Sequence, residues 1–218
     1  MRLLLINPNS SRHITERMAA SACYALTAGD TLTAVTATGE PVVVRSAAML
    51  AQADANALAL ARAHAPGHDA LLLAISLDGA APRLRAEHPG LAVLGMTEAA
   101  VAAALAAGGS FGLLTLGQAL VPLYRARVES LGAASALAAI EAPELDAAFT
   151  PATHGVDAAV LHGLLPAARR LVDTGAQSIV LAGAVRCGYA AALAAALGVP
   201  VFDGVACAVR QLHASASA

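Results

Sequence analysis

The stretches LLLAISLDG (71–79) and IVLAGAVRCG (179–188) each carry a short apolar run into a turn of small and polar residues. Short apolar runs bounded by turns are typical of strands buried on both faces, as in parallel sheets. Between such runs lie Ala-rich stretches of helical length. Strands that alternate with helices in this way predict an α/β fold built on parallel sheets.

The chain also repeats itself. Each of these stretches is followed by a similar segment, GLAVLGMTEAAV (90–101) in one case and GVPVFDGVACAV (198–209) in the other, and Ser76 and Gly183 hold equivalent places 107 residues apart. An internal repeat predicts two pseudo-symmetric α/β halves in tandem, with the ligand cleft between them. The expected domains are 1–97 together with 205–218, and 98–204.

The remaining patterns place the other elements. Two Ala-rich stretches, 99–107 and 190–197, suit close helix packing and predict a homo-oligomer.

Strands are expected at 2–6, 31–38, 70–75, 91–95, 111–114, 178–181 and 199–202, and helices at 12–26, 47–65, 81–87, 121–131, 157–174, 190–197 and from Val205.

The composition indicates a globular chain with no membrane segment. Hydrophobic residues make up 58% and charged residues 13%, which supplies a sizeable core. The longest uncharged stretch, 99–124, is interrupted by glycines and a proline, so no transmembrane helix is predicted. The first residues lack the pattern of a secretory signal, which makes a cytoplasmic location the default expectation.

Charge and residue usage exclude several classes of protein. A net charge of −2 and 3% aromatic residues argue against nucleic-acid binding. All 13 basic residues are arginine, so neither a pyridoxal-phosphate Schiff base nor a P-loop lysine can form. Three cysteines without CxxC spacing and seven histidines without ligand spacing indicate neither disulfides nor a metal site.

Turns at strand ends are the candidate binding elements, because ligands of open parallel sheets lie at the carboxyl ends of the strands. Four turns qualify, at 7–11, 76–79, 115–118 and 183–188. Their amides and hydroxyls favour an anion or a carboxylate, and a neighbouring arginine could bind a carboxylate bidentately. The candidate substrate-binding residues are Asn9, Ser10, Leu77, Thr115, Ala184 and Arg186.

The sequence resembles the aspartate/glutamate/hydantoin racemase superfamily, and most of all its hydantoin and allantoin racemase branch. The resemblance spans nearly the whole chain and rests on INPNSS (6–11), on the segment 69–76, and on GVPVFDG (198–204). It implies a cofactor-independent enzyme for a small substrate with a carboxylate or imide group. In such enzymes two cysteines face each other across the α-carbon, and one removes the proton that the other returns.

This sequence departs from that pattern at both catalytic positions. Ser76 and Gly183 stand where the resemblance places the two cysteines. A hydroxyl is a poor substitute, because only a thiol titrates near neutral pH. A relocated thiol is one answer: if a helix begins near Arg186, Cys187 lies in its first turn, where the helix dipole lowers its pKa.

Three functions remain open at this point. The chain could be an isomerase acting on a hydantoin-like amino-acid derivative, impaired by the loss of both thiols. It could resemble the arylmalonate decarboxylases, which use one cysteine opposite a glycine, although they keep the cysteine that Gly183 replaces here. It could also be an inactive relative that binds a small molecule in the cleft. A serine hydrolase is disfavoured, because no GxSxG motif surrounds Ser76.

Overall fold

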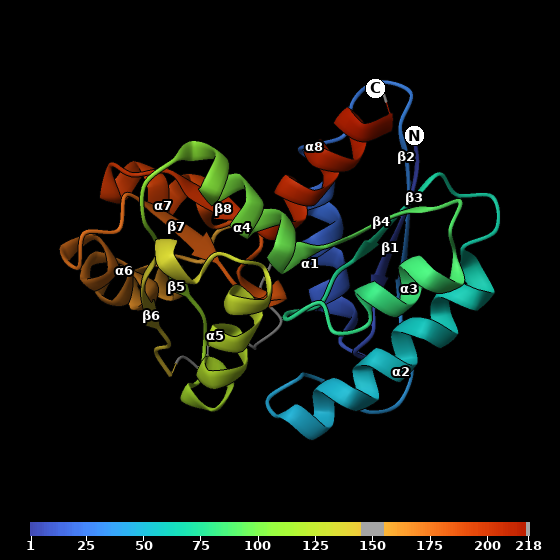
Figure 1. The fold of residues 1–218 in the computed structure, drawn as a ribbon, viewed down its shortest axis with the longest axis horizontal. Coiled ribbons are helices and arrows are strands. Elements are labelled where there is room, and N and C mark those ends of the chain that lie inside the picture. The colour runs from blue at the N-terminus through green and yellow to red at the C-terminus, as the bar shows by residue number, and fades with distance from the viewer. Residues whose placement is uncertain (145–154, 217–218) are drawn as a thin grey trace.

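The computed structural model describes residues 1–144 and 155–216 and contains two parallel four-stranded sheets (Figure 1). The strand order is β2-β1-β3-β4 in the first sheet and β6-β5-β7-β8 in the second, and all pairs are parallel. The second order repeats the first, so the prediction of two tandem α/β halves is confirmed.

Helices and strands alternate through both halves, as the sequence predicted. The first half contains β1 (Arg2–Asn7), α1 (Arg12–Cys23), β2 (Thr31–Thr36), α2 (Ala47–His64), β3 (Ala70–Leu73), α3 (Ala81–Glu87) and β4 (Ala92–Gly95). The second half contains α4 (Met96–Ala107), β5 (Phe111–Leu114), η1 (Gln118–Leu120), α5 (Val121–Ser130), η2 (Ala134–Ala136), β6 (Leu137–Glu141), α6 (Ala158–Asp173), β7 (Ser178–Leu181), η4 (Ala184–Arg186), α7 (Ala190–Leu197), β8 (Val201–Asp203) and α8 (Gly204–Ala216).

One strand lies outside the sequence predictions. The sequence of β6 is LAAIE, which contains a single β-branched residue, and the strand is only partly buried. It lies at the edge of its sheet and pairs with β5 alone. Because that pairing is a long-range contact, local propensity gives little sign of it.

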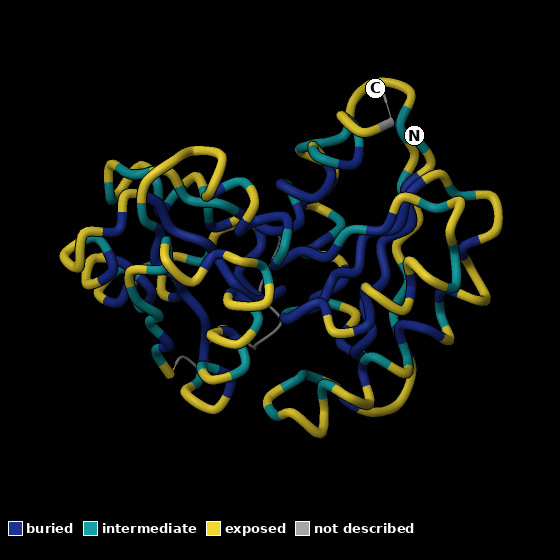
Figure 2. Tube along the Cα trace, in the orientation of Figure 1, coloured by how far each residue is buried: buried dark blue, intermediate teal, exposed yellow. Residues whose placement is uncertain are grey.

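Both faces of each sheet are covered by helices, and β1 shows how. Leu3 and Leu5 pack in one core cluster with residues of α1 and α8, whereas Leu4 and Ile6 pack in another with residues of α2 and α3. Successive side chains of a strand point to opposite faces, so a strand buried on both sides must be continuously apolar. Figure 2 shows the buried strands inside and the exposed residues along the outer helices.

The C-terminal helix α8 joins the two halves. It contacts α1, β3 and β4 as well as α4 and β8, and the Gln211 amide donates to the Ala99 carbonyl (2.8 Å). One core cluster runs from Leu3 through Met96 and Val205 to Leu164 of α6. The halves therefore share buried apolar surface, and the domain bounds given above stay a prediction.

The described part of the chain contains no helix with both the length and the apolar character needed to cross a membrane.

Candidate active site

Ser76 and Gly183 face each other across a small cavity between the two halves. Ser76 is the third residue after β3 and Gly183 is the second after β7. A Cβ atom placed on Gly183 would lie 3.5 Å from Ser76 Oγ. The cavity measures about 50 Å³. Its described lining residues are Asn9, Ile14, Val43, Val44, Ile75, Ser76, Leu116, Leu120, Tyr124, Gly183, Ala184, Val185 and Arg186.

A strained turn holds Ser76 in place. Leu77 and Asp78 follow it with φ of 74° and 50°, a region that few residues other than glycine adopt. Such strain persists only where the surroundings impose it. Here the Leu77 amide donates to Thr97 Oγ1 (3.2 Å), and the buried Asp78 carboxylate accepts from the amides of Thr97 (3.0 Å) and Glu98 (2.8 Å) at the start of α4.

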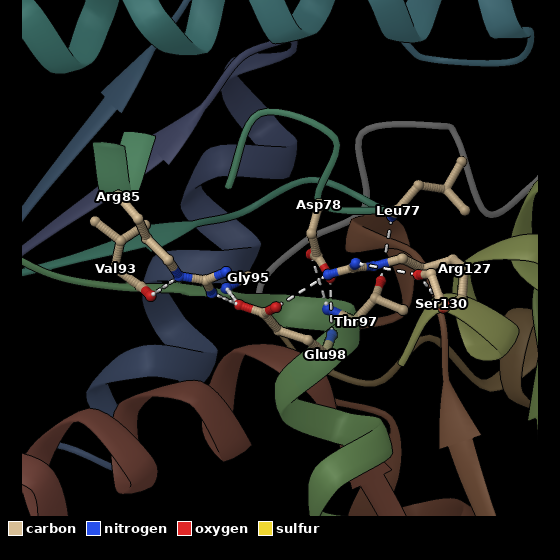
Figure 3. A network of polar contacts seen from close by, with 9 residues as sticks. All are labelled: Leu77, Asp78, Arg85, Val93, Gly95, Thr97, Glu98, Arg127 and Ser130. Carbon is tan, nitrogen blue, oxygen red and sulfur yellow. Dashed lines mark hydrogen bonds and ion pairs between the residues drawn. The ribbon is translucent and has the colours of Figure 1, made fainter. Parts of the chain in front are cut away.

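An ion-pair network ties this turn to the second half (Figure 3). Arg127 of α5 donates to Asp78 Oδ2 (3.2 Å) and to Glu98 Oε2 (3.0 Å). Glu98 also pairs with Arg85 of α3. Burial raises the pKa of Asp78 to about 6, although Arg127 acts in the opposite direction. Ion pairs with residues of both halves thus stabilise the turn that carries Ser76.

Arg186 occupies the other wall of the cavity. The side chain is fully buried, and a Cβ atom on Gly183 would clash with its Nη2 atom. Gly183 itself has a φ of 111°, a conformation that side chains rarely tolerate. Burial lowers the pKa of the guanidinium to about 10, so it remains charged at neutral pH. Its Nε and Nη1 atoms have no hydrogen-bond partner among the described residues.

Tyr124 is a cavity residue that the sequence did not reveal. It is a fully buried residue of α5, beside the hydroxyls of Ser76 and Thr115, and its own hydroxyl has no partner of standard hydrogen-bond geometry among the described residues. Burial raises the pKa of this phenol, and Arg186 acts against the increase. On a helix with other buried residues, nothing in the local sequence distinguishes a tyrosine that faces a site from one in the core.

Cys187 lies in a different place from the one expected. The residues after Gly183 form the short helix η4, and α7 begins at Ala190, so the condition set for a relocated thiol, a helix that begins near Arg186, is not met. Cys187 is buried and lines a second cavity of about 520 Å³. Burial raises the pKa of its thiol well above the ordinary value, and Asp203 adds to the increase. The expected lowering of this pKa is therefore wrong.

The second cavity lies on the side of α1 and α7. His13 and Arg17 of α1 line it together with Cys187 and Asp203. Arg17 donates to the Cys187 carbonyl (3.4 Å), and its guanidinium lies 5.3 Å from the centre of the Tyr189 ring. Asp203 accepts from Ser21 Oγ (2.9 Å) and from the Gly188 amide (2.7 Å). Cys187 thus belongs to a wall that Ser76 and Gly183 do not share.

The predicted substrate-binding residues fall into two groups. Asn9, Ala184 and Arg186 line the small cavity. Asn9 Oδ1 accepts from Asn7 Nδ2 (3.1 Å) and from the Ser11 amide (3.0 Å), so Nδ2 is the group of Asn9 that is left for a ligand.

The second group does not line this cavity. The Ser10 amide donates to the Pro41 carbonyl (3.0 Å) and the Leu77 amide donates to Thr97 Oγ1, so neither amide is available to a ligand. Thr115 is buried beside Tyr124, and its amide donates to the Glu141 carbonyl (2.8 Å). Among the described residues, no group of three or more His, Cys, Asp or Glu side chains is placed to hold a metal ion.

Comparison with known proteins identifies the fold that carries this site. The family model of Asp/Glu/hydantoin racemases matches residues 3–212. The chain belongs to the Asp/Glu/hydantoin racemase family. The hydantoin racemase of Paenarthrobacter aurescens is 31% identical to this family member over 215 residues, which cover 96% of this chain and 89% of that protein. The predicted family is confirmed.

Solved structures share the racemase fold. Allantoin racemase from Klebsiella pneumoniae matches with a TM-score of 0.89 at 24% identity, over 100% of this chain and 88% of that one. Unliganded arylmalonate decarboxylase matches with a TM-score of 0.61 at 14% identity, over 98% and 91% of the two chains. At these identities the likeness concerns the fold of this racemase-family chain and not its substrate.

Proposed function

We propose that the protein is a cofactor-independent isomerase of the racemase type, whose substrate is a small amino-acid derivative with a carboxylate or imide group. The observation that supports this most is the position of Ser76 Oγ, 3.5 Å from the place of a Cβ on residue 183. Two groups on opposite walls of a cavity between the halves can remove a proton from one face of an α-carbon and return it on the other. The 3.5 Å separation is a direct van der Waals contact, so the walls must move apart to admit an α-carbon between them. The names of the relatives, hydantoin racemase and allantoin racemase, point to hydantoin-like substrates.

The residues on the two walls of the cavity determine the expected rate of proton transfer. Neither Ser76 nor Gly183 supplies a thiol, and burial raises the pKa of the Tyr124 phenol, which makes it a weak acid and a poor proton carrier near neutral pH. Arg186 favours the negative charge that develops on a substrate as its α-proton leaves. We therefore expect a complete binding site with slow proton transfer. The homo-oligomeric state and the cytoplasmic location stay predictions.

Deuterium exchange tests this proposal. Hydantoins, allantoin, aspartate and glutamate are incubated in heavy water, and label at the α-carbon is followed by NMR or mass spectrometry. The comparison is the unmodified chain against Ser76→Cys/Gly183→Cys/Arg186→Met. Ser76→Cys/Gly183→Cys with Arg186 retained is measured beside it, because a side chain at position 183 must displace Arg186 Nη2 and Arg186 itself favours the charge that develops on the substrate.

The expected result is exchange at least about 100-fold faster in the better of the two variants that carry both cysteines, the scale of positioned acid–base catalysis. Rates equal to that of the unmodified chain in both variants would contradict the proposed impairment. Absence of exchange from the whole panel in all three proteins, with both variants folded by circular dichroism, would contradict the racemase function.

A decarboxylase is the second candidate. The observation that favours it is the Arg186 guanidinium at the cavity, which can hold a carboxylate, whereas Gly183 stands where these decarboxylases are expected to keep a cysteine. Release of carbon dioxide from arylmalonates, measured in the same samples, would support this alternative. Saturable binding without exchange or release would instead identify a small-molecule-binding relative.

A further inference from the structure

Arg186 is a buried cation without a carboxylate partner. Its relative exposure is 1%, and no ion pair joins it to any described acidic residue. Two of its three nitrogens, Nε and Nη1, have no hydrogen bond in the described part of the chain. An unpaired buried charge is unfavourable, and a bound anion offsets that cost.

The surroundings of Arg186 supply further donors and no acid. The described residues that line the cavity include Ser76, Tyr124 and Asn9, and none of them is Asp or Glu. The nearby Asp78 is engaged by Arg127 and by two backbone amides. The guanidinium and the hydroxyls therefore face the cavity without a competing carboxylate.

The guanidinium lies beside the two positions proposed for proton transfer. Nη2 lies where a side chain on residue 183 would be, and Ser76 Oγ lies on the opposite wall. The cavity of about 50 Å³ has room for a group of a few heavy atoms, since one water molecule needs about 10–15 Å³ of cavity volume. A planar carboxylate can bind a guanidinium through two parallel hydrogen bonds, which a neutral ring carbonyl cannot do.

We propose that Arg186 makes the cleft selective for open-chain α-substituted carboxylates, such as N-acylated amino acids, over the neutral hydantoin ring. This inference rests on the proposed function, because it takes the cavity between Ser76 and Gly183 as the substrate site. The carboxylate is bound by Arg186 and by the hydroxyls of Ser76 and Tyr124. No part of this recognition needs a thiol, so it operates in the chain as it stands.

The test compares two ligands of nearly the same shape, one with a carboxylate and one with a neutral carboxamide in its place. Binding of N-acetylalanine and of N-acetylalaninamide is measured by isothermal titration calorimetry, with 5-methylhydantoin and inorganic phosphate as further probes. The proteins are the unmodified chain, Arg186→Met, Arg186→Lys and the control Arg62→Met. Arg62 is an exposed arginine on α2, paired with Glu87 and outside the residues that line the cavity.

We expect the unmodified chain and Arg62→Met to bind the acid about 10- to 100-fold more tightly than the amide, as a charge-assisted contact predicts. In Arg186→Met the two affinities become equal within a few-fold, and Arg186→Lys is intermediate because it lacks the planar fork. Thermal unfolding checks that each variant is folded.

Several outcomes would overturn the inference. These are equal affinities for acid and amide in the unmodified chain, absence of binding of the acid, a preference that survives Arg186→Met, and phosphate binding that the acid does not displace, which would indicate an inorganic anion site. A larger acceleration of α-proton exchange, relative to the uncatalysed rate, for neutral hydantoins than for the acids would contradict this inference and support the proposed function. A carboxylate preference in binding without α-proton exchange on any substrate would support this inference and contradict the proposed function.

Discussion

The Arg186 guanidinium fills the space that a side chain on Gly183 would need. The two residues are separated by one short turn of helix, η4, and the φ of 111° at Gly183 starts that turn. A glycine at one wall of the cavity and a buried arginine behind it are therefore one structural feature. Any change at position 183 must be considered together with residue 186.

We expect Gly183→Ala to lower the free energy of unfolding by about 1–3 kcal/mol, the cost of holding a side chain in a disfavoured backbone region, plus the cost of displacing Arg186. The cost of displacing Arg186 disappears when Arg186 is replaced by Met. Urea unfolding of both single variants and of the double variant measures the coupling between them. If the two changes are additive, the guanidinium does not occupy the space described.

Arg127→Met is expected to destabilise the fold by about 3 kcal/mol, because it leaves the buried carboxylate of Asp78 without its cation. The matched control is Arg170→Met, which breaks the exposed pair with Glu141 and is expected to cost much less, because water screens exposed ion pairs. Chemical unfolding at neutral pH separates the two. Equal losses in both variants would show that the Asp78–Arg127 pair contributes no more than a surface ion pair.

The pH dependence of stability carries a signature of Asp78. Burial raises its pKa from 3.8 to about 6 in the folded chain, so the folded state binds this proton more tightly than the unfolded state does. The stability contributed by the protonated form is complete below pH 3.8 and is lost as the pH rises through about 6. Asn cannot titrate, so the difference in unfolding free energy between the unmodified chain and Asp78→Asn should fall across this window and stay level above it. A difference that rises from pH 4 to pH 7 would contradict the direction of this pKa shift.

Cys187→Ala should change α-proton exchange by less than about twofold, because the thiol lines the larger cavity and its raised pKa disfavours the thiolate. Cys207→Ala serves as a control for the loss of another buried thiol. A loss of about 100-fold that is specific to Cys187 would instead identify it as the proton carrier.

Much of the fold could be predicted because its signals are local. Runs such as Leu3 to Ile6 are apolar at every position, and a strand with helices on both faces requires that pattern. The internal repeat predicted two halves of equal topology. Of the residues predicted from the turns after β3 and β7, Ser76, Gly183, Ala184 and Arg186 line the small cavity, whereas Leu77 and Cys187 do not. The edge strand β6 was not predicted, because its formation depends on pairing with β5.

The sequence by itself determined the two α/β halves, the family, and the presence of serine and glycine at the two positions of interest. Only the tertiary structure decided that Arg186 fills the space beside Gly183, that Tyr124 joins the site, and that Cys187 belongs to the other cavity. The physical reason is that hydrophobic periodicity reports which residues are buried and not what they face. The direction of a side chain after a strand depends on the backbone angles of the turn and on the packing of distant segments, and both exist only in the folded chain.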